Sequence, residues 1–328
     1  MTTGLVERVS EDRAAFPSLA ESVPLIGGTA AARAGATGRG WAVAVLDTGV
    51  DTSHPFLSGK AVAEACFTDA ACRGGSARQI GFGAGRPFPF FGCDHGTHVA
   101  GIAVGRGTGF SGVAPEGKLI AIQVFNDCGP CAFSSNLILA LDHVLSLASH
   151  HKIAAVNMSL GGGLFSEFCD FDELKLPIDL LRARGVATVV ASHNQGAAGA
   201  IASPACISSA IATAATYDDI LNERITEYSN IAPMVDLLAP GSFIDSSVPG
   251  GFFATFSGTS MAAPHVAGAW AALKSKAPSA GVARVETALK ATGKRLTDPE
   301  TGLALPRIRV DVALRALLTG HTVARAPP

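Results

Sequence analysis

Charged and aromatic residues are scarce in this 328-residue chain: Asp, Glu, Lys and Arg make up 16% of it, and Phe, Trp and Tyr 6%. The charges nearly balance, with 25 Lys and Arg against 27 Asp and Glu, for a formal net charge of -2. Proteins that bind nucleic acid or anionic membranes carry a marked excess of positive charge. We therefore expect neither partner.

Long apolar runs are also absent. No run approaches the roughly 20 residues that span a bilayer, so we predict no membrane span. The first ten residues lack the apolar core of a secretory signal peptide. What the chain has instead is 37 Gly and 48% hydrophobic residues, which suffice for a large core and exclude disorder as the main state.

Short apolar runs alternate with helical patterns along the chain. We expect strands at residues 41–46, 119–124, 154–158, 186–191, 211–215 and 235–239, and helices near residues 137–148, 174–181, 260–277 and 284–291. The strands are almost continuously apolar, which is typical of strands covered on both faces. The pattern predicts an α/β fold: a doubly wound, mostly parallel central sheet with helices on both faces, in three layers.

The domain organisation is expected to be simple, because no internal repeat and no Pro-rich, Ser-rich or charged linker divides the chain. Residues 1–22 are interpreted as an N-terminal extension or the remnant of a propeptide, and residues 321–328 as a C-terminal tail. One domain would occupy residues 23–320. Within it, the Gly-rich and Phe-rich residues 67–92 are typical of a surface insertion.

The first expected strand ends at Asp47, followed by Thr and Gly. Sites in open parallel sheets lie at the carboxyl ends of strands, so this carboxylate is a candidate for chemistry. The simpler interpretation is a turn Asp that bonds its own backbone. An aspartic protease would need a second Asp-Thr-Gly, and therefore a dimer, and the alternation of strands and helices contradicts its all-β fold.

His95 opens a helix of small residues within residues 93–101. The N-terminus of a helix disfavours an imidazolium, which suits a neutral general base near pH 7. Capping of the helix is one alternative. Metal binding by His95 and His98 is another, although no Glu stands between them as in a metalloprotease helix.

Ser260 opens a later helix after a Gly turn, with an exposed hydroxyl and an N–H that can donate to a developing oxyanion. Asn194 follows a buried strand and can offer a carboxamide N–H to the same charge. An ordinary N-cap serine and a loop asparagine are the alternatives. Only together do these residues indicate catalysis.

The chain order Asp47, His95, Ser260 is that of one of three unrelated serine-protease triads. The residues lie in the motifs Ala-Val-Leu-Asp-Thr-Gly-Val-Asp-Thr-Ser-His-Pro (44–55), His-Gly-Thr-His-Val-Ala-Gly (95–101) and Gly-Thr-Ser-Met-Ala-Ala-Pro-His-Val-Ala-Gly (258–268). With Val-Asn-Met-Ser-Leu-Gly-Gly (156–162), they make the chain resemble a subtilisin-like serine protease, or subtilase. The resemblance covers residues 41–273 and extends towards residue 318.

The resemblance implies a serine endopeptidase that acts on proteins or peptides through an acyl-enzyme. Ser260 would be the nucleophile, His95 the base, and Asp47 the residue that orients His95 and stabilises its cation. Asn194 and the Ser260 N–H would form the oxyanion hole. The family also implies two walls for an extended substrate, formed by Ser159, Leu160, Gly161 and Gly162 on one side and Ala191, Ser192 and His193 on the other.

The sequence departs from the family pattern at two places. His193 stands where the family usually has Gly, which leaves the preference for P1, the substrate residue whose carbonyl is attacked, open. Residues 104–111 lack the side chains of the family's strong calcium site. Asp236 matches the carboxylate of a weaker site, or is a solvated strand residue. We expect no cofactor in the chemistry, and a structural calcium is left open.

The chain has seven cysteines, which favour disulfides and export from the cytoplasm. The expected pairs are Cys169–Cys206 and Cys128–Cys131, with one further pair among Cys66, Cys72 and Cys93. A zinc cluster or a redox motif at 128–131 is disfavoured, because a second close pair and a thioredoxin-like unit are missing. An intracellular subtilase is the alternative.

Two other functions stay open. A subtilase fold could bind peptides without cutting them, with His193 obstructing the pocket, or it could transfer the acyl group to an amine. We expect a monomer whose partners are protein or peptide substrates and its own propeptide.

Overall fold

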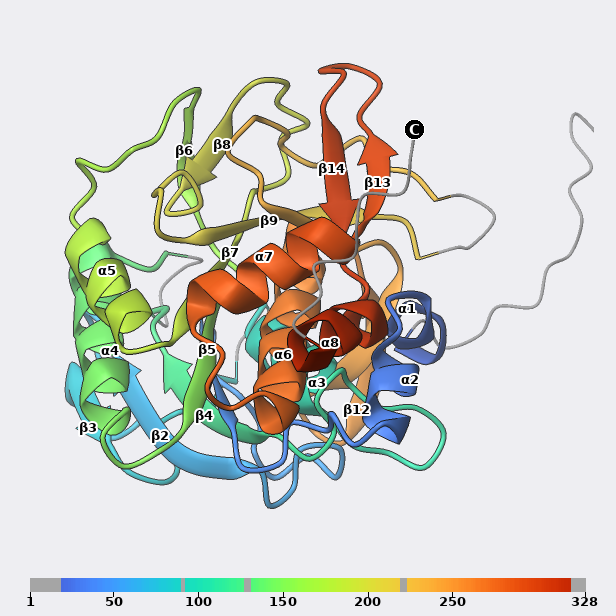
Figure 1. Ribbon diagram of the computed structural model, residues 1–328. Helices are drawn as coiled ribbons and strands as arrows, with labels where there is room; N and C mark the ends of the chain where they lie inside the picture. The colour runs from blue at the N-terminus through green and yellow to red at the C-terminus, as the bar shows by residue number, and fades with distance from the viewer. Residues whose placement is uncertain (1–18, 90–91, 127–130, 219–222, 320–328) are drawn as a thin grey trace, which may run out of the picture.

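The computed structural model describes residues 19–89, 92–126, 131–218 and 223–319. Through the described residues runs a ten-stranded sheet in the order β13-β14-β10-β9-β7-β5-β1-β4-β2-β3 (Figure 1). Neighbouring strands from β14 to β2 are parallel, whereas β13 and β3 pair antiparallel at the two edges. This confirms the predicted α/β class.

The strands of the sheet are β1 (Ala42–Asp47), β2 (Ala61–Phe67), β3 (Arg78–Ile80), β4 (Lys118–Gln123), β5 (Ile153–Met158), β7 (Ala187–Ala191), β9 (Ile211–Thr216), β10 (Leu237–Pro240), β13 (Lys294–Thr297) and β14 (Ala304–Arg307). Two small antiparallel pairs are formed by β6 (Gly162–Phe165) with β8 (Ile201–Ser203) and by β11 (Ile244–Val248) with β12 (Phe252–Phe256). The helices are α1 (Leu19–Leu25), α2 (Gly28–Arg33), α3 (His95–Val104), α4 (Ser134–Leu147), α5 (Lys175–Ala183), α6 (Thr259–Lys276), α7 (Val282–Thr292) and α8 (Val310–Thr319).

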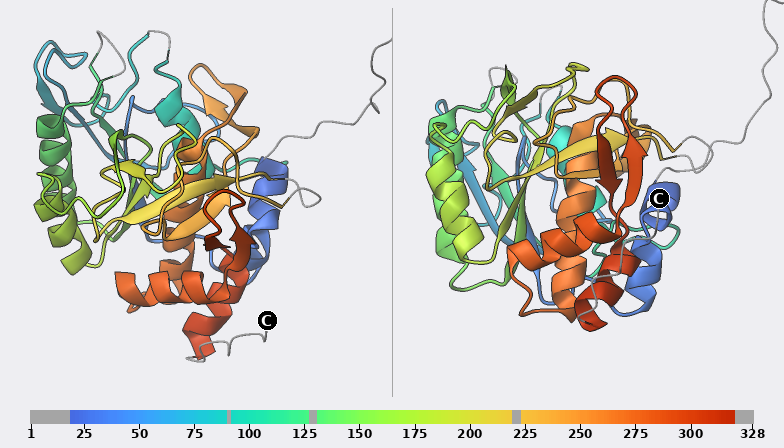
Figure 2. Two further views of the ribbon diagram at one scale, coloured as in Figure 1. Left: turned by 90° about the horizontal axis from the view of Figure 1, so that it is seen from above. Right: turned by 45° about the horizontal axis from the view of Figure 1, so that its top comes forward.

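Helices cover both faces of the sheet (Figures 1 and 2). On one face α4 and α5 pack together, and on the other α6 crosses the central strands beside α3, with α1, α2, α7 and α8 outside it. Alternate residues of β1 face opposite ways, so that Val43 and Val45 join the core under α3 and α6 while Ala44 and Leu46 join the core under α4 and α5. The three layers are therefore as predicted.

The six expected strands occur within two residues of their predicted bounds. Strand β2 was not predicted, because Glu64 interrupts its apolar pattern. That side chain is 4% exposed and accepts hydrogen bonds from the Thr52 hydroxyl (2.9 Å) and the Gly83 N–H (2.8 Å). A buried carboxylate with such partners is compatible with a core strand. The hairpin β11–β12 was also missed, although Gly250 and Gly251 in its turn are a hairpin signal.

Of the expected N-terminal extension, the structure describes residues 19–22. Residues 1–18 of the expected extension, and the expected tail at residues 321–328, lie outside the described residues. Leu19 is 1% exposed, and the Ser22 hydroxyl hydrogen-bonds His265 Nε2 on α6 at 2.9 Å. Residues 19–22 are thus part of the folded body. In the described ranges, no helix combines the length and apolarity needed to cross a membrane.

Candidate active site

Asp47 and His95 meet at the carboxyl edge of the sheet. Asp47 ends β1 with a fully buried side chain, and its Oδ1 accepts a hydrogen bond from His95 Nδ1 at 2.8 Å and from the Thr48 N–H at 2.7 Å. The approach of α3 to β1 requires glycine at position 96, because a Cβ there would lie 2.3 Å from the Gly49 carbonyl oxygen. The hydrogen bond that Nδ1 donates to Asp47 fixes the ring proton on Nδ1 and leaves Nε2 of the neutral ring as an acceptor.

Two opposing effects act on the pKa of His95. Burial lowers it, and the Asp47 carboxylate raises it by charge and by hydrogen bonding, with a smaller contribution from Asp94. The carboxylates prevail, so the pKa of His95 lies above its ordinary value. The ring is 27% exposed and faces the cleft described below.

Ser260 lies in the first turn of α6, across the same edge. Its hydroxyl donates to the Ser159 carbonyl at 3.3 Å, and the Ser159 hydroxyl donates to the Ser260 carbonyl at 2.7 Å. Among the described residues, no hydrogen bond joins Ser260 to His95. In free enzymes catalytic hydrogen bonds are often long or misaligned and tighten when substrate binds.

The carboxamide of Asn194 has a defined orientation. Its oxygen accepts hydrogen bonds from the Thr259 N–H at 2.8 Å and the Thr259 hydroxyl at 2.9 Å. The amide nitrogen therefore faces the other way. Gly258, with φ 156°, precedes this turn, and a Cβ there would stand 3.4 Å from Asn194 Nδ2. Glycine at 258 thus keeps the approach to the amide open.

The hairpin β11–β12 joins the helix that carries His95 to the segment before Ser260. The His98 Nε2 lies 3.0 Å from the carbonyl oxygens of Ile244 and Ala254, one on each strand. Burial lowers the pKa of His98 to about 3, so the ring is neutral and Nε2–H donates. His98 is therefore part of the scaffold, and a metal site shared with His95 finds no support. Sequence reasoning missed this role because it depends on the hairpin.

A cleft of about 830 Å³ opens beside His95. The predicted residues Ser159, Leu160, Gly161, Gly162 and His193 line it. Ala191 and Ser192 do not, because they are 2% and 0% exposed beneath it. Besides the predicted residues that line it and His95, the lining comprises Thr48, Gly92, Phe125, Cys131, Ala132, Phe133, Ser134, Leu137, Gly163, Phe165, Asp172, Leu174, Ser203 and Pro204. Ser134 and Leu137 come from α4, Gly163 and Phe165 from β6 and Ser203 from β8, and the others come from loops that the fold brings together.

His193 has a positive φ of 85°. This is left-handed backbone that residues with a Cβ rarely adopt and glycine adopts freely. The finding explains physically why Gly is the residue expected at this position. The side chain stands at the cleft wall, and a Cβ built on Gly161 would lie 3.5 Å from its Cδ2.

Asp236 does not fit a calcium site. Its Oδ1 pairs with Lys290 Nζ at 2.5 Å, and its Oδ2 accepts the Ala212 N–H at 2.9 Å. Lys290 also pairs with Glu286 at 2.8 Å. The ammonium group already supplies the positive charge that a cation would bring, and both carboxylate oxygens are engaged. The donor set therefore disfavours a metal at Asp236.

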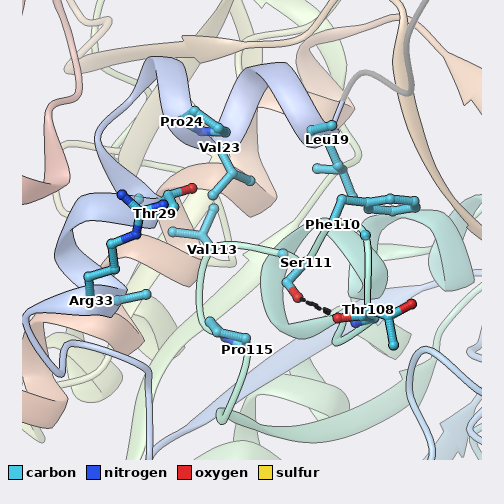
Figure 3. A pocket seen from close by; sticks show the side chains of 16 residues that line it. Leu19, Val23, Pro24, Thr29, Arg33, Thr108, Phe110, Ser111, Val113 and Pro115 are labelled. Atoms are coloured by element: carbon cyan, nitrogen blue, oxygen red, sulfur yellow. Dashed lines mark hydrogen bonds between the residues drawn. The ribbon is translucent and has the colours of Figure 1, made fainter.

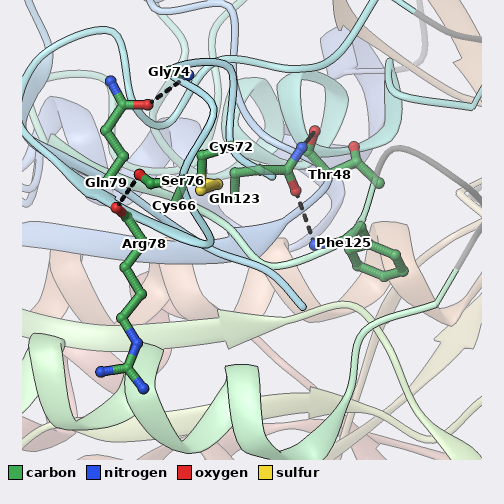
Figure 4. The surroundings of a disulfide bond; sticks show 9 residues. All are labelled: Thr48, Cys66, Cys72, Gly74, Ser76, Arg78, Gln79, Gln123 and Phe125. Atoms are coloured by element: carbon green, nitrogen blue, oxygen red, sulfur yellow. Dashed lines mark hydrogen bonds between the residues drawn. A yellow bond between two sulfur atoms is a disulfide. The ribbon is translucent and has the colours of Figure 1, made fainter. Parts of the chain in front are cut away.

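Two disulfides are present among the described residues, Cys66–Cys72 and Cys169–Cys206. The second confirms a predicted pair, and the first is the expected pair among three candidates. Cys66–Cys72 lies beside Gln123, whose amide donates to the Thr48 carbonyl at 2.7 Å (Figure 4). Cys131 carries a free, exposed thiol, which does not fit the predicted bond to Cys128, a residue outside the described ranges.

A second hollow, of about 470 Å³, lies between α1, α2 and residues 107–115 (Figure 3). Leu19, Val23, Phe110 and Val113 give it an apolar wall. Residues 107–111 of this segment belong to the stretch 104–111, which was expected to lack calcium ligands. Within it the Ser111 hydroxyl oxygen accepts a hydrogen bond from the Gly107 N–H at 3.3 Å. This hollow shares no lining residue with the cleft beside His95.

The parallel sheet, with the Asp47–His95 pair at the end of β1 and the Ser260–Ser159 contact just after β5, is typical of an α/β serine hydrolase. The model of the Subtilase family matches residues 38–305, and the chain belongs to this family. It is an enzyme, a serine-type endopeptidase that hydrolyses peptide bonds.

The chain is 37% identical to Subtilisin Savinase of Lederbergia lenta over 84% of its own length and 93% of the relative's. It is 36% identical to the alkaline protease of Shouchella clausii, over 87% of its own length and 68% of the relative's. A solved structure titled S41 Psychrophilic Protease is similar with a TM-score of 0.69 at 29% identity, over 83% of this chain and 92% of that one.

Proposed function

We propose that the enzyme cleaves peptide bonds through an acyl-enzyme on Ser260, with His95 as base and Asp47 as its orienting partner. The observation that carries this proposal is the 2.8 Å hydrogen bond between His95 Nδ1 and the fully buried Asp47. Such a bond leaves His95 Nε2 as the proton acceptor and stabilises the imidazolium that forms during attack.

In the first step the Ser260 hydroxyl turns from the Ser159 carbonyl towards His95. The Ser260 oxygen then bonds to the substrate carbonyl carbon while its proton passes to His95 Nε2. Collapse of the tetrahedral intermediate breaks the C–N bond, and His95 returns the proton to the leaving amine. Water, deprotonated by His95, then hydrolyses the ester and restores Ser260.

The oxyanion would be held by Asn194 Nδ2 and the Ser260 N–H. The Asn194 carboxamide already has its oxygen engaged by Thr259, so no rotation is needed to present its N–H groups. Ser260 lies in the first turn of α6, where backbone N–H groups have no partner within the helix. Donors placed in advance in this way stabilise the transition state more than the substrate.

Substrate would lie as an extended strand along residues 159–162, with its P1 side chain in the cleft that Gly161 and His193 line. Protein and peptide substrates suit this arrangement, because main-chain hydrogen bonds bind any sequence and pockets read the side chains. Two disulfides support a site of action outside the cytoplasm. We further propose that the enzyme acts as a monomer and meets its own propeptide in the same cleft.

Labelling with a fluorophosphonate probe tests the function. The folded wild type should acquire one covalent adduct, on Ser260, located by peptide mass spectrometry. Ser260→Ala should lower kcat on a casein substrate by roughly 10⁶, and Asn194→Ala by about 10²–10³, the losses known for the corresponding subtilisin residues. A folded protein that takes up no probe and leaves casein intact would refute the proposal and favour a binding role.

A further inference from the structure

Asp172 contributes a carboxylate to the cleft beside the expected P1 position. It lies in the loop between β6 and α5 and lines the same cleft as Gly161 and His193. The Ser203 hydroxyl donates a hydrogen bond to its Oδ2. Ser203 itself is paired with Gly162 across the two strands β6 and β8. Asp172 thus lies in the cleft beside the β6–β8 pair.

The position of this carboxylate is constrained from several sides. Its Oδ1 accepts the Leu174 N–H at 2.8 Å, and the Asp172 N–H donates to the Cys169 carbonyl at 2.9 Å. Cys169 is bonded to Cys206, three residues beyond Ser203. The disulfide and the hydrogen bond from Ser203 therefore tie the Asp172 loop to β8, and the two hydrogen bonds with Leu174 and Cys169 hold the carboxylate within its own loop. Such pre-organisation reduces the entropy lost when a ligand binds.

The charge of Asp172 has no cationic partner among the described residues. The lysine that follows it most closely, Lys175, is paired with Asp179 at 2.5 Å. A carboxylate offers about four acceptor positions, of which two are used here by Ser203 and Leu174. The remaining positions can accept hydrogen bonds from an ammonium or a guanidinium group, which form stronger bonds with a carboxylate than neutral donors do.

We propose that Asp172 is a specificity-determining residue, which selects substrates with Arg or Lys at P1. This proposal rests on the proposed function, because it places the P1 side chain in the cleft that Gly161, His193 and Asp172 line. A cationic P1 side chain would neutralise the negative charge of Asp172, which has no other cationic partner among the described residues. The cleft is partly enclosed, and there an ion pair is screened less by solvent than at an open surface. A neutral P1 side chain of the same shape would leave the charge of Asp172 without a partner.

The test uses two peptides that differ only at P1, one with arginine and one with the neutral isostere citrulline. Wild-type enzyme should cleave the arginine peptide with a kcat/KM about tenfold higher or more, and added salt should reduce this ratio. Asp172→Asn should bring the ratio close to one. Glu167→Gln removes a charge from the same loop at an exposed residue outside the cleft, and should preserve the ratio.

The outcomes separate this inference from the proposed function. Cleavage of both peptides at equal rates by the wild type would overturn the role of Asp172 and leave the peptidase intact. Cleavage of neither peptide, with no probe on Ser260, would refute the function itself. Because the ratio and its salt dependence are measured on the wild type, the inference stays testable even if Asp172→Asn does not fold.

Discussion

Thr259 holds Asn194 in one orientation: its N–H and its hydroxyl both donate to the Asn194 carboxamide oxygen, at 2.8 and 2.9 Å. The oxygen of the same hydroxyl accepts a hydrogen bond from the His193 N–H at 3.2 Å. The Thr259 hydroxyl proton is donated to Asn194. Thr259, the residue before Ser260, thereby points the Asn194 amide N–H groups towards the expected oxyanion.

Thr259→Val should therefore lower kcat about tenfold with little change in KM, because one of the two hydrogen bonds that orient Asn194 is lost. Thr259→Ser retains the hydroxyl and should restore most of the activity. Steady-state kinetics on a chromogenic peptide measure both. A valine variant with wild-type kcat would show that the backbone N–H alone orients Asn194.

The pH dependence should follow the pKa of His95. The ring must be neutral to accept a proton, so activity falls as pH drops through its pKa. Because Asp47 raises that pKa, the acid limb of kcat/KM should have its midpoint above 6.5, the ordinary value for histidine. In Ser260→Ala protein, NMR titration of His95 should give the same midpoint, and Asp47→Asn should move it down. A midpoint below 6.5 in both measurements would contradict the Asp47 coupling.

The sequence predicted those site residues that carry a local signal. Asp47 ends an apolar run, His95 and Ser260 open helices, and Asn194 follows a strand, so each could be placed at one edge of a parallel sheet. Asp172 could not be found in this way. Its place in the cleft depends on Ser203, 31 residues away, and no periodicity encodes a contact between two loops.

The same distinction holds for the fold. Strands buried on both faces were predicted because their sequences are almost continuously apolar. Strand β2 was not predicted, because it contains Glu64, a carboxylate whose burial depends on hydrogen bonds from polar partners. The hairpin β11–β12 was not predicted either, because the Phe-rich strand β12 is largely exposed. Such elements are stabilised by tertiary contacts rather than by their own pattern.

His193 combines a functional and a conformational effect, and two variants separate them. His193→Gly should raise the free energy of unfolding by about 1 kcal/mol, because the positive φ of 85° no longer strains a Cβ-bearing residue. It should also improve cleavage after Phe and Tyr by widening the cleft. His193→Ala widens the cleft but keeps the Cβ. It should therefore also improve cleavage after Phe and Tyr, but it should not raise the free energy of unfolding. Equal stability of the two variants would contradict the strain argument.

Acid should destabilise the fold through two buried histidines. Burial lowers the pKa of His98 to about 3 and that of His265 to about 4. Between these values and the ordinary 6.5, the unfolded chain binds a proton at each position and the folded chain does not. Stability therefore falls with falling pH, by up to about 1.4 kcal/mol per pH unit for each histidine.

Replacing His265 by Gln should flatten this dependence, measured by denaturant unfolding at pH 7 and pH 5 in the Ser260→Ala background, which prevents autolysis. His95 has a raised pKa and contributes with the opposite sign, since its stabilisation is present at low pH and is lost as pH rises through that pKa. This contribution is common to both proteins and cancels in the comparison. An unchanged pH slope would rule out His265 as a source of acid sensitivity.

The two disulfides should differ in their contribution to stability. Cys169–Cys206 closes a loop with a sequence separation of 37 residues, and Cys66–Cys72 one of 6. Chain entropy then predicts losses of about 4 and about 2 kcal/mol when each pair is replaced by Ala. Denaturant unfolding of both double variants in the Ser260→Ala background measures the difference.

Loss of Cys169–Cys206 should also loosen the loop that carries Asp172, because the Asp172 N–H bonds the Cys169 carbonyl. With Ser260 present, the arginine-to-citrulline ratio of that double variant should fall, whereas removal of Cys66–Cys72 should leave it unchanged. A larger stability loss for the shorter loop would contradict the entropic argument. An unaltered ratio in both variants would show that the hydrogen bonds of Asp172 position its carboxylate without the disulfide.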